Sequence, residues 1–240
     1  MEAASHFPTT TWTLVLSAGR QPDAHSHDAL ASLCEKYWYP LYAYIRRRGY
    51  PVEQAQDLTQ EFFARVLEKR YIERADRNKG RFRTFLLSSL TYFLLDEKDR
   101  RHALKRGGSQ ALLPFEFRDG EETYQREPSH DETPEKIFER RWALAILARV
   151  LARMRAEFSR GGNPAHFERL KAFLLGQDDE FLYADVAREL QTTEGALKVA
   201  IHRLRKRYRG MLRAEIAETV SDPGEIEAEM RYLASALVAR

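Results

Sequence analysis

The stretch from Tyr183 to Leu212 constrains the fold most, because it combines a break with a long amphipathic pattern. Asp185 to Leu190 has the apolar spacing of a short helix, and Gln191-Thr192 interrupts it. Thr193 can then cap a second helix, because its hydroxyl can accept a hydrogen bond from an otherwise unpaired backbone N–H. Apolar residues recur in this second helix at intervals of four and three, which predicts one buried face: Leu197, Ile201, Leu204, Tyr208 and Leu212.

The other faces of this predicted helix are basic. Seven Lys and Arg residues lie between Lys198 and Arg213, with no acidic residue among them. A helix with one face in a core and another rich in Lys, Arg and His suits the major groove of DNA. The alternative interpretation is a solvated basic helix on an ordinary helical protein.

The distribution of charge is more informative than its sum. The formal net charge is only +3 over 240 residues, whereas acids dominate between Glu116 and Glu139. Such segregation indicates one surface for a polyanion and another that avoids it. It also leads to the hypothesis that the acidic segment covers a basic surface of the same chain.

Helical spacing recurs along the rest of the chain, and no segment alternates as a strand would. We therefore predict an all-α fold, with further helices over Asp28–Ile45, Pro51–Lys69, Thr84–Asp99, Ile137–Phe158 and Ala165–Leu175 and a last one from Asp222-Pro223. Gly107–Pro134 is acidic and contains repeated Gly and Pro, which predicts a linker. The expected parts are an N-terminal extension (1–27), a first domain (28–106), the linker (107–134), a second domain (135–220) and a C-terminal helix (221–240).

No catalytic or metal-binding motif is present in the sequence. The common phosphate-binding, dinucleotide-binding, zinc-protease and serine-hydrolase patterns are absent, and the seven histidines are scattered. We expect no catalytic residue, no metal site and no cofactor, and therefore not an enzyme. The single cysteine, Cys34, fits a reducing compartment. No stretch approaches the roughly 20 apolar residues of a membrane span, and the first residues lack a signal peptide pattern, so we expect a cytoplasmic protein without membrane insertion.

Three motifs, in this order, carry a family resemblance: AQDLTQEFFARVLEK (Ala55–Lys69), GRFRTFLLSSLTYFLLDEKDRR (Gly80–Arg101) and ADVARELQTTEGALKVAIHRLRKR (Ala184–Arg207). Together they resemble a bacterial RNA polymerase sigma factor of the sigma-70 family, of the small extracytoplasmic-function (ECF) type that keeps only regions 2 and 4. The resemblance covers about residues 30–106 and 138–216. It implies two small helical domains, a region 2-like domain and a region 4-like helix-turn-helix domain, joined by the acidic linker.

The resemblance implies core RNA polymerase and promoter DNA as partners. The polymerase contacts would be the β′ clamp helices and the β flap, and an anti-sigma factor is a further hypothesis. The first motif is similar to the helix with which the family grips the β′ clamp. A docking helix needs a patterned polar face and an apolar anchor, and the residues of these types are Asp57, Gln60, Glu61 and Phe63.

The second motif resembles the part of the family that melts and reads the −10 promoter element. Aromatic side chains can catch unstacked bases, and cations can hold single-stranded phosphates. The residues predicted for this role are Asn78, Lys79, Phe82, Arg83, Tyr92, Arg100 and Arg101. Phe85 and Phe93 have the spacing of core residues instead.

The third motif resembles the reader of the −35 element. Lys and Arg can donate to guanine, and Val can touch a thymine methyl group. The resemblance places base contacts on the face with Lys198, Val199, His202 and Arg203. Phosphate contacts, which add salt-dependent affinity without sequence choice, are predicted for Arg205, Lys206 and Arg209.

The leading hypothesis is a sigma factor that binds core RNA polymerase and directs promoter recognition and transcription initiation. The alternative is an autonomous helix-turn-helix transcriptional regulator, which would usually be a dimer reading two half-sites. Glu225–Val238 could supply a dimer surface. A helical interaction module without transcriptional activity is a third possibility. The AQDLTQEFF stretch favours the sigma factor, because a regulator that acts without polymerase does not need it.

Overall fold

The computed structural model describes Trp12 and residues 24–67, 81–103, 117–126, 132–161, 164–175 and 180–238. In these residues the chain is helical, and extended backbone pairs only at an isolated antiparallel bridge between Arg81 and Val220. The prediction of an all-α fold is therefore confirmed for the described residues. The chain divides into two compact units, Met1–Ala145 with Ile216–Arg240, and Ile146–Glu215.

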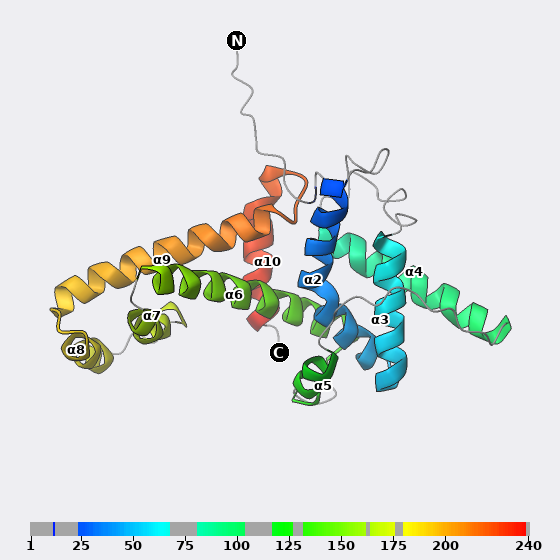
Figure 1. Ribbon diagram of the computed structural model, residues 1–240, viewed down its shortest axis with the longest axis horizontal. Helices are drawn as coiled ribbons and strands as arrows, with labels where there is room; N and C mark the ends of the chain where they lie inside the picture. The colour runs from blue at the N-terminus through cyan, green and yellow to red at the C-terminus, as the bar shows by residue number, and fades with distance from the viewer. Residues whose placement is uncertain are drawn as a thin grey trace, which may run out of the picture. The chain divides into compact units, whose positions relative to one another are not determined.

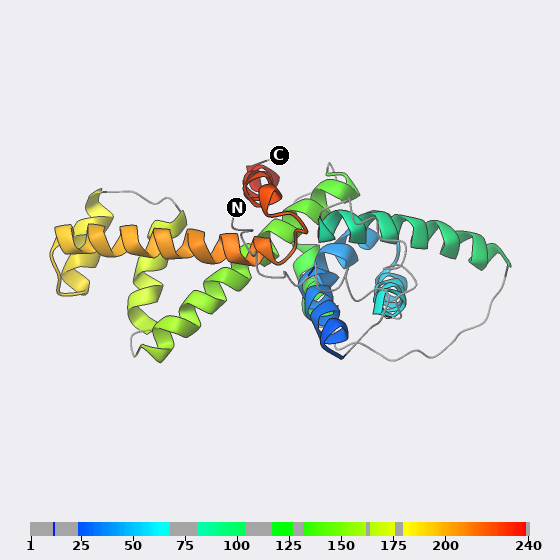
Figure 2. The same ribbon diagram turned by 90° about the horizontal axis from the view of Figure 1, so that it is seen from above.

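The first unit contains three helices that contact one another. They are α2 (Ala24–Arg47), α3 (Val52–Leu67) and α4 (Phe82–Ala103). α2 and α3 lie side by side (Figure 1), and α4 passes close to both (Figure 2). Gly49 makes the turn between α2 and α3 with a φ of 89°, a conformation that glycine adopts without the steric cost of a Cβ.

Aromatic side chains make much of the core of the first unit. The ring of Phe82 on α4 lies 5.0 Å from that of Tyr37 on α2 and 4.9 Å from that of Trp12, and Phe62 on α3 lies 5.6 Å from Phe93 on α4. These edge-to-face and tilted contacts are favourable ring geometries. Tyr37, Phe62 and Phe93, which lie on the apolar faces of their helices, are all buried in this core.

A fourth helix, α5 (Phe117–Gln125), packs on α2 in the first unit. Glu121 accepts hydrogen bonds from the Arg46 guanidinium at 3.0 Å and from the Tyr42 hydroxyl at 2.5 Å. Gly120 approaches the Trp38 ring so closely that a Cβ would lie 2.8 Å from it. The segment predicted as a linker therefore contains a docked helix, on which Glu121 shares a face with Phe117.

The first unit is completed by the start of α6 (Pro134–Arg160) and by the segment that follows α9 (Glu194–Ala217). This last segment contains the short 3₁₀ helix η3 (Pro223–Glu225) and α10 (Ile226–Val238). A C-terminal helix separate from both domains was predicted for residues 221–240. The structure groups those residues with the first unit instead.

The second unit contains the rest of α6 and α9 and the elements between them. These are α7 (Pro164–Leu170), the 3₁₀ helix η2 (Lys171–Leu175) and α8 (Glu180–Glu189). Its core is apolar and aromatic, with Phe158 5.4 Å from Phe167 and Phe173 4.7 Å from Tyr183, measured between ring centroids. Arg207 of α9 pairs with Glu157 of α6 at 2.6 Å.

Helix boundaries differ from the predicted ones at α8, which begins at Glu180 rather than at Asp185, and at α9, which continues to Ala217 rather than ending at Leu212. They differ also at α2, which begins at Ala24 rather than at Asp28 and runs through Pro40. The last helix-breaking residue before it in the sequence is Pro22, so nothing in the sequence prevents the earlier start. Among the described residues, no helix is both long enough and apolar enough to cross a membrane.

The α5 contact predicts a pH-dependent stability. Burial alone would raise the pKa of the Glu121 carboxyl, but its hydrogen bonds with Arg46 and Tyr42 outweigh burial and lower that pKa. The Glu121→Gln variant should lower the free energy of unfolding by about 1–2 kcal/mol near neutral pH. A depressed folded pKa means that this contribution is complete above the ordinary value of 4.5 and disappears as pH falls through the folded pKa.

Urea unfolding followed by circular dichroism at several pH values measures this difference. The matched control is Asp119→Asn, because Asp119 is an exposed acid on the same helix. Equal losses for both variants, or a Glu121→Gln loss that persists unchanged into acid, would contradict the assignment.

Candidate nucleic-acid interface

The turn between α8 and α9 in the second unit is built as the sequence predicts. Gln191 has a φ of 52°, and the Thr192 N–H donates to the Ala187 carbonyl at 2.9 Å, which closes the end of α8. Thr193 caps α9, because its hydroxyl accepts from the Ala196 N–H at 3.2 Å. Two helices therefore meet at a tight, capped turn.

α9 presents its cations on the side opposite its core. Leu197, Ile201 and Leu204 are buried and Tyr208 is half-buried, as the spacing predicts. Most residues predicted to read the −35 element are exposed along the rest of the helix: Lys198, Val199, His202, Arg203, Lys206 and Arg209. Val199 is 50% exposed, so its side chain is available for contact. The structure brings these six side chains together on one element.

Arg205 is placed differently from the other predicted phosphate ligands. Its guanidinium donates twice to the Phe173 carbonyl of η2, at 2.8 and 3.1 Å. The role predicted for Arg205 is therefore corrected: its donors hold η2 against α9. The periodicity of α9 puts Arg205 next to Leu204 and Ile201 on the edge of the buried face, which explains the contact.

Tyr183 is a residue of this surface that sequence reasoning did not select. The Lys198 ammonium lies 5.5 Å from the centroid of its ring, and the ring also contacts that of Phe173, with 4.7 Å between centroids. A cation over an aromatic face is held electrostatically. Tyr183 thus connects an exposed cation of α9 to the core of the second unit.

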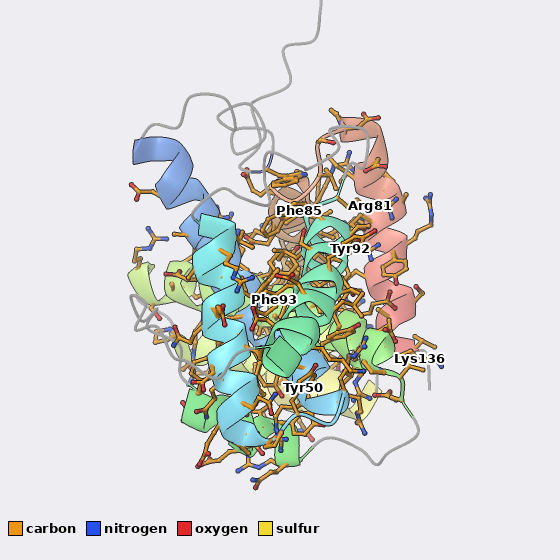
Figure 3. The ribbon with its side chains drawn as sticks, turned by 90° about the vertical axis from the view of Figure 1, so that its right-hand side faces the viewer. Tyr50, Arg81, Phe85, Tyr92, Phe93 and Lys136 are labelled. Carbon is orange, nitrogen blue, oxygen red and sulfur yellow. The ribbon has the colours of Figure 1, made fainter. Side chains whose placement is uncertain are left out.

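In the first unit, α4 has one exposed face that carries an aromatic side chain. Tyr92 is 72% exposed and Leu95 is 52% exposed. Figure 3 shows Tyr92 on α4, between α3 and α10. Exposed small polar residues and a cation lie along the same helix: Thr84, Ser88 and Lys98. An exposed ring beside hydroxyls and an ammonium offers both stacking and phosphate contacts.

Two residues predicted for the −10 element lie in the core instead. Phe82 is fully buried among the rings of Tyr37 and Trp12, and Arg83 is buried in an ion pair with Glu229. A DNA-contacting role for Phe82 and Arg83 is corrected for this reason. Asn78 and Lys79 lie outside the described residues, and for Arg100 and Arg101 the structure describes only their place in α4.

The residues predicted to contact polymerase lie on α3. Asp57 is exposed, and Gln60 and Glu61 are partly exposed. Phe63 is fully buried, with its ring 5.5 Å from that of Phe62, so its predicted role as a surface anchor is corrected. When two aromatic residues are adjacent on a helix, the sequence alone does not tell which of them faces the core. Here both Phe62 and Phe63 are buried.

An ion-pair network joins α3 to α4 beside this surface. Arg65 of α3 contacts Glu61 on its own helix, Glu97 of α4 at 2.6 Å and Asp96 of α4 at 3.6 Å. Its guanidinium also lies 4.8 Å from the centroid of the Phe93 ring. The acidic face of α3 is therefore fixed against α4 by one cation.

No group of three or more His, Cys, Asp or Glu side chains that could hold a metal ion occurs in the part of the chain that the structure describes. The surface chemistry of the described helices is thus that of cations, acids and an exposed aromatic ring.

Comparison with known families finds a match within the first unit. Residues 33–103, which span α3, α4 and most of α2, match the family model of sigma-70 region 2. This part of the chain is similar to sigma-70 region 2. The match supports a role in RNA polymerase binding and promoter melting, and it covers less than half of the chain. No curated protein and no solved structure matches the sequence.

The Thr193 cap at the start of α9 can be tested through the local stability of the helix. Replacing Thr193 with Ala should cost about 1 kcal/mol of local stability, because the Ala196 N–H loses its acceptor. Hydrogen exchange at Ala196 and the next turn of α9 measures this loss. Thr192→Ala, an exposed neighbour just before the cap, should have little effect. Equal effects of the two changes would rule out the cap.

Proposed function

We propose that this protein is a sigma factor that binds core RNA polymerase and directs transcription initiation from promoters with −10 and −35 elements. The observation that carries the proposal is the sigma-70 region 2 match, followed in the same chain by a capped turn and an exposed basic helix. This order is that of regions 2 and 4 in the ECF type, which is the subtype that we propose. A cytoplasmic location and the absence of catalysis follow from this role.

In this proposal, α3 docks on the β′ clamp helices of the polymerase. Its polar face with Asp57, Gln60 and Glu61 supports the assignment, because a patterned charged surface gives orientation and specificity to an encounter. The Arg65 network gives this face a fixed position relative to α4. The second unit would contact the β flap, and an anti-sigma factor remains a further candidate partner.

The exposed face of α4 is proposed to hold the melted −10 element. Tyr92 is, among the aromatic residues that the structure describes, the one best exposed for stacking on an unpaired base. Arg100 and Arg101, later in the same helix, are proposed to hold phosphates. Asn78 and Lys79 keep their predicted role in base capture.

The exposed face of α9 is proposed to read the −35 element in the major groove. Lys198, Val199, His202 and Arg203 would contact bases, and Lys206 and Arg209 would contact phosphates. Neither domain needs high affinity alone, because the polymerase holds both and supplies a high effective concentration. A nearly neutral chain with one basic face agrees with such shared binding.

Run-off transcription from genomic fragments, with purified core polymerase and the full chain, tests the proposal. Discrete transcripts that depend on the chain are expected. DNA binding without copurification with core polymerase would instead favour the autonomous regulator. Copurification without transcripts would favour a scaffold that has lost transcription.

Substitutions on α9 should separate base reading from phosphate binding. Arg203→Ala should change the preferred −35 sequence, because a lost base contact costs about 1–3 kcal/mol at one position. Lys206→Ala should weaken all promoters about equally and reduce the dependence of log affinity on log salt by about one. Selection from randomised −35 sequences and a salt titration measure the two effects.

Arg205→Ala is the internal comparison for this pair of substitutions. Because the Arg205 guanidinium donates to the Phe173 carbonyl, the Arg205→Ala variant should have a lower free energy of unfolding. The salt dependence of its DNA binding should be nearly unchanged. An unchanged sequence preference in Arg203→Ala would count against the base assignment.

Tyr92→Ala should slow promoter opening by about tenfold, because stacking of a base on an aromatic ring contributes about 1–3 kcal/mol. Permanganate reactivity of unpaired thymines with core polymerase measures opening. Tyr92→Phe should keep most of the rate, since it keeps the ring, and Leu95→Ala is the matched exposed control on α4. Normal opening in Tyr92→Ala would remove Tyr92 from the proposed site.

A further inference from the structure

The segment after α9 completes the first unit through backbone pairing. The Phe82 N–H donates to the Thr219 carbonyl at 2.9 Å, beside the bridge between Arg81 and Val220. The Trp12 N–H donates to the Glu218 carbonyl at 3.0 Å. These bonds hold the first residues of α4 in place, because Phe82 begins that helix.

A buried ion pair lies next to this pairing. The Arg83 guanidinium donates to both carboxylate oxygens of Glu229 on α10, at 2.5 and 3.1 Å, and the Glu229 side chain is 1% exposed. Arg83 also lies 3.9 Å from the centroid of the Tyr232 ring and 5.1 Å from that of Trp142. Charge, hydrogen bonds and aromatic contacts therefore all fix one guanidinium.

The surroundings of the pair are fixed as well. Arg81 reaches Glu229 at 3.2 Å and Glu225 at 3.5 Å (Figure 3 labels Arg81 near α10). The Trp142 indole N–H donates to the Tyr37 hydroxyl at 3.0 Å. Burial and a hydrogen bond with Glu139 raise the pKa of Tyr232 to about 12. Three helices, α4, α6 and α10, thus meet at Arg83.

Stability alone is a weak reason for such a pair. Desolvating two charges costs several kcal/mol, and well-packed apolar residues often do as well or better. A bidentate pair does impose geometry, because the planar guanidinium and the carboxylate meet in one orientation. Burial alone would lower the pKa of Arg83, but Glu229 outweighs it and raises that pKa, so the guanidinium stays charged.

We propose that Glu229 is a positioning residue for promoter opening, acting through Arg83 on the orientation of α4. Arg83 and Tyr92 are separated by about two and a half helical turns, which puts them on opposite sides of α4. Glu229 holds the inner side of α4, and Tyr92 lies on its exposed side. The inference rests on the proposed function, because it concerns the opening step of the same helix.

The first test compares Glu229→Gln with the wild type in full-length protein. Loss of the charge should loosen the first turn of α4 and lower the rate of promoter opening roughly tenfold, because small misplacements of reacting groups cost large factors in rate. Affinity for core polymerase, which we assign to α3, should stay unchanged. Permanganate reactivity and a binding titration with core polymerase measure the two quantities. Arg231→Gln, which removes an exposed charge from α10, is the matched control.

A double variant separates positioning from stability. Replacing the pair with apolar residues, Arg83→Met with Glu229→Leu, should restore the thermal stability lost in Glu229→Gln, because a buried ion pair can be exchanged for apolar packing. Opening should remain slow, since the directional contact is gone. Recovery of opening together with stability would overturn the proposal, and so would normal opening in Glu229→Gln.

The result for the wild type distinguishes the proposed function of the protein from the proposed role of Glu229. If the wild type with core polymerase opens no promoter, the proposed function fails. If the wild type opens promoters and both variants do so equally well, only the role of Glu229 fails.

Discussion

The ion pair between Arg83 and Glu229 joins residues 146 positions apart in the chain and lies where α4, α6 and α10 meet. Much of the first unit depends on it. Removing either partner would leave an uncompensated buried charge, which costs several kcal/mol. The pair also joins the residues after α9 to the unit that contains residues 33–103, the part similar to sigma-70 region 2, so the matched residues do not form the whole folded unit.

The two units carry different surface chemistry. The first presents an acidic face on α3 and an exposed ring on α4, and the second presents cations along α9. Acidic α5 is held by the aromatic and cationic face of α2, through Glu121 and Arg46. The proposed protein-docking surface on α3 and the two proposed DNA-contacting surfaces on α4 and α9 therefore lie on separate elements.

Periodicity predicted the helices and the turn, because each depends on residues near one another in sequence. The Thr193 cap and the buried face of α9 are of this kind. Phe82 and Arg83 are buried against partners far away in the chain, and so their residue types suggested surface roles that the structure does not support. Phe63 is buried as well. One signal was present: Glu229 has the spacing of the buried residues Ile226 and Leu233, which marks an acid that needs a cation.

The most direct measurement of the central claim is site-specific crosslinking in the complex with core polymerase. A photoreactive residue in place of the exposed Asp57 on α3 should crosslink to the β′ subunit. The same residue in place of the exposed Arg155 on α6 serves as the control and should not crosslink to the β′ clamp helices. No crosslink from position 57 to β′, in a complex that transcribes, would contradict the docking surface. No complex at all would contradict the assignment of the chain as a sigma factor.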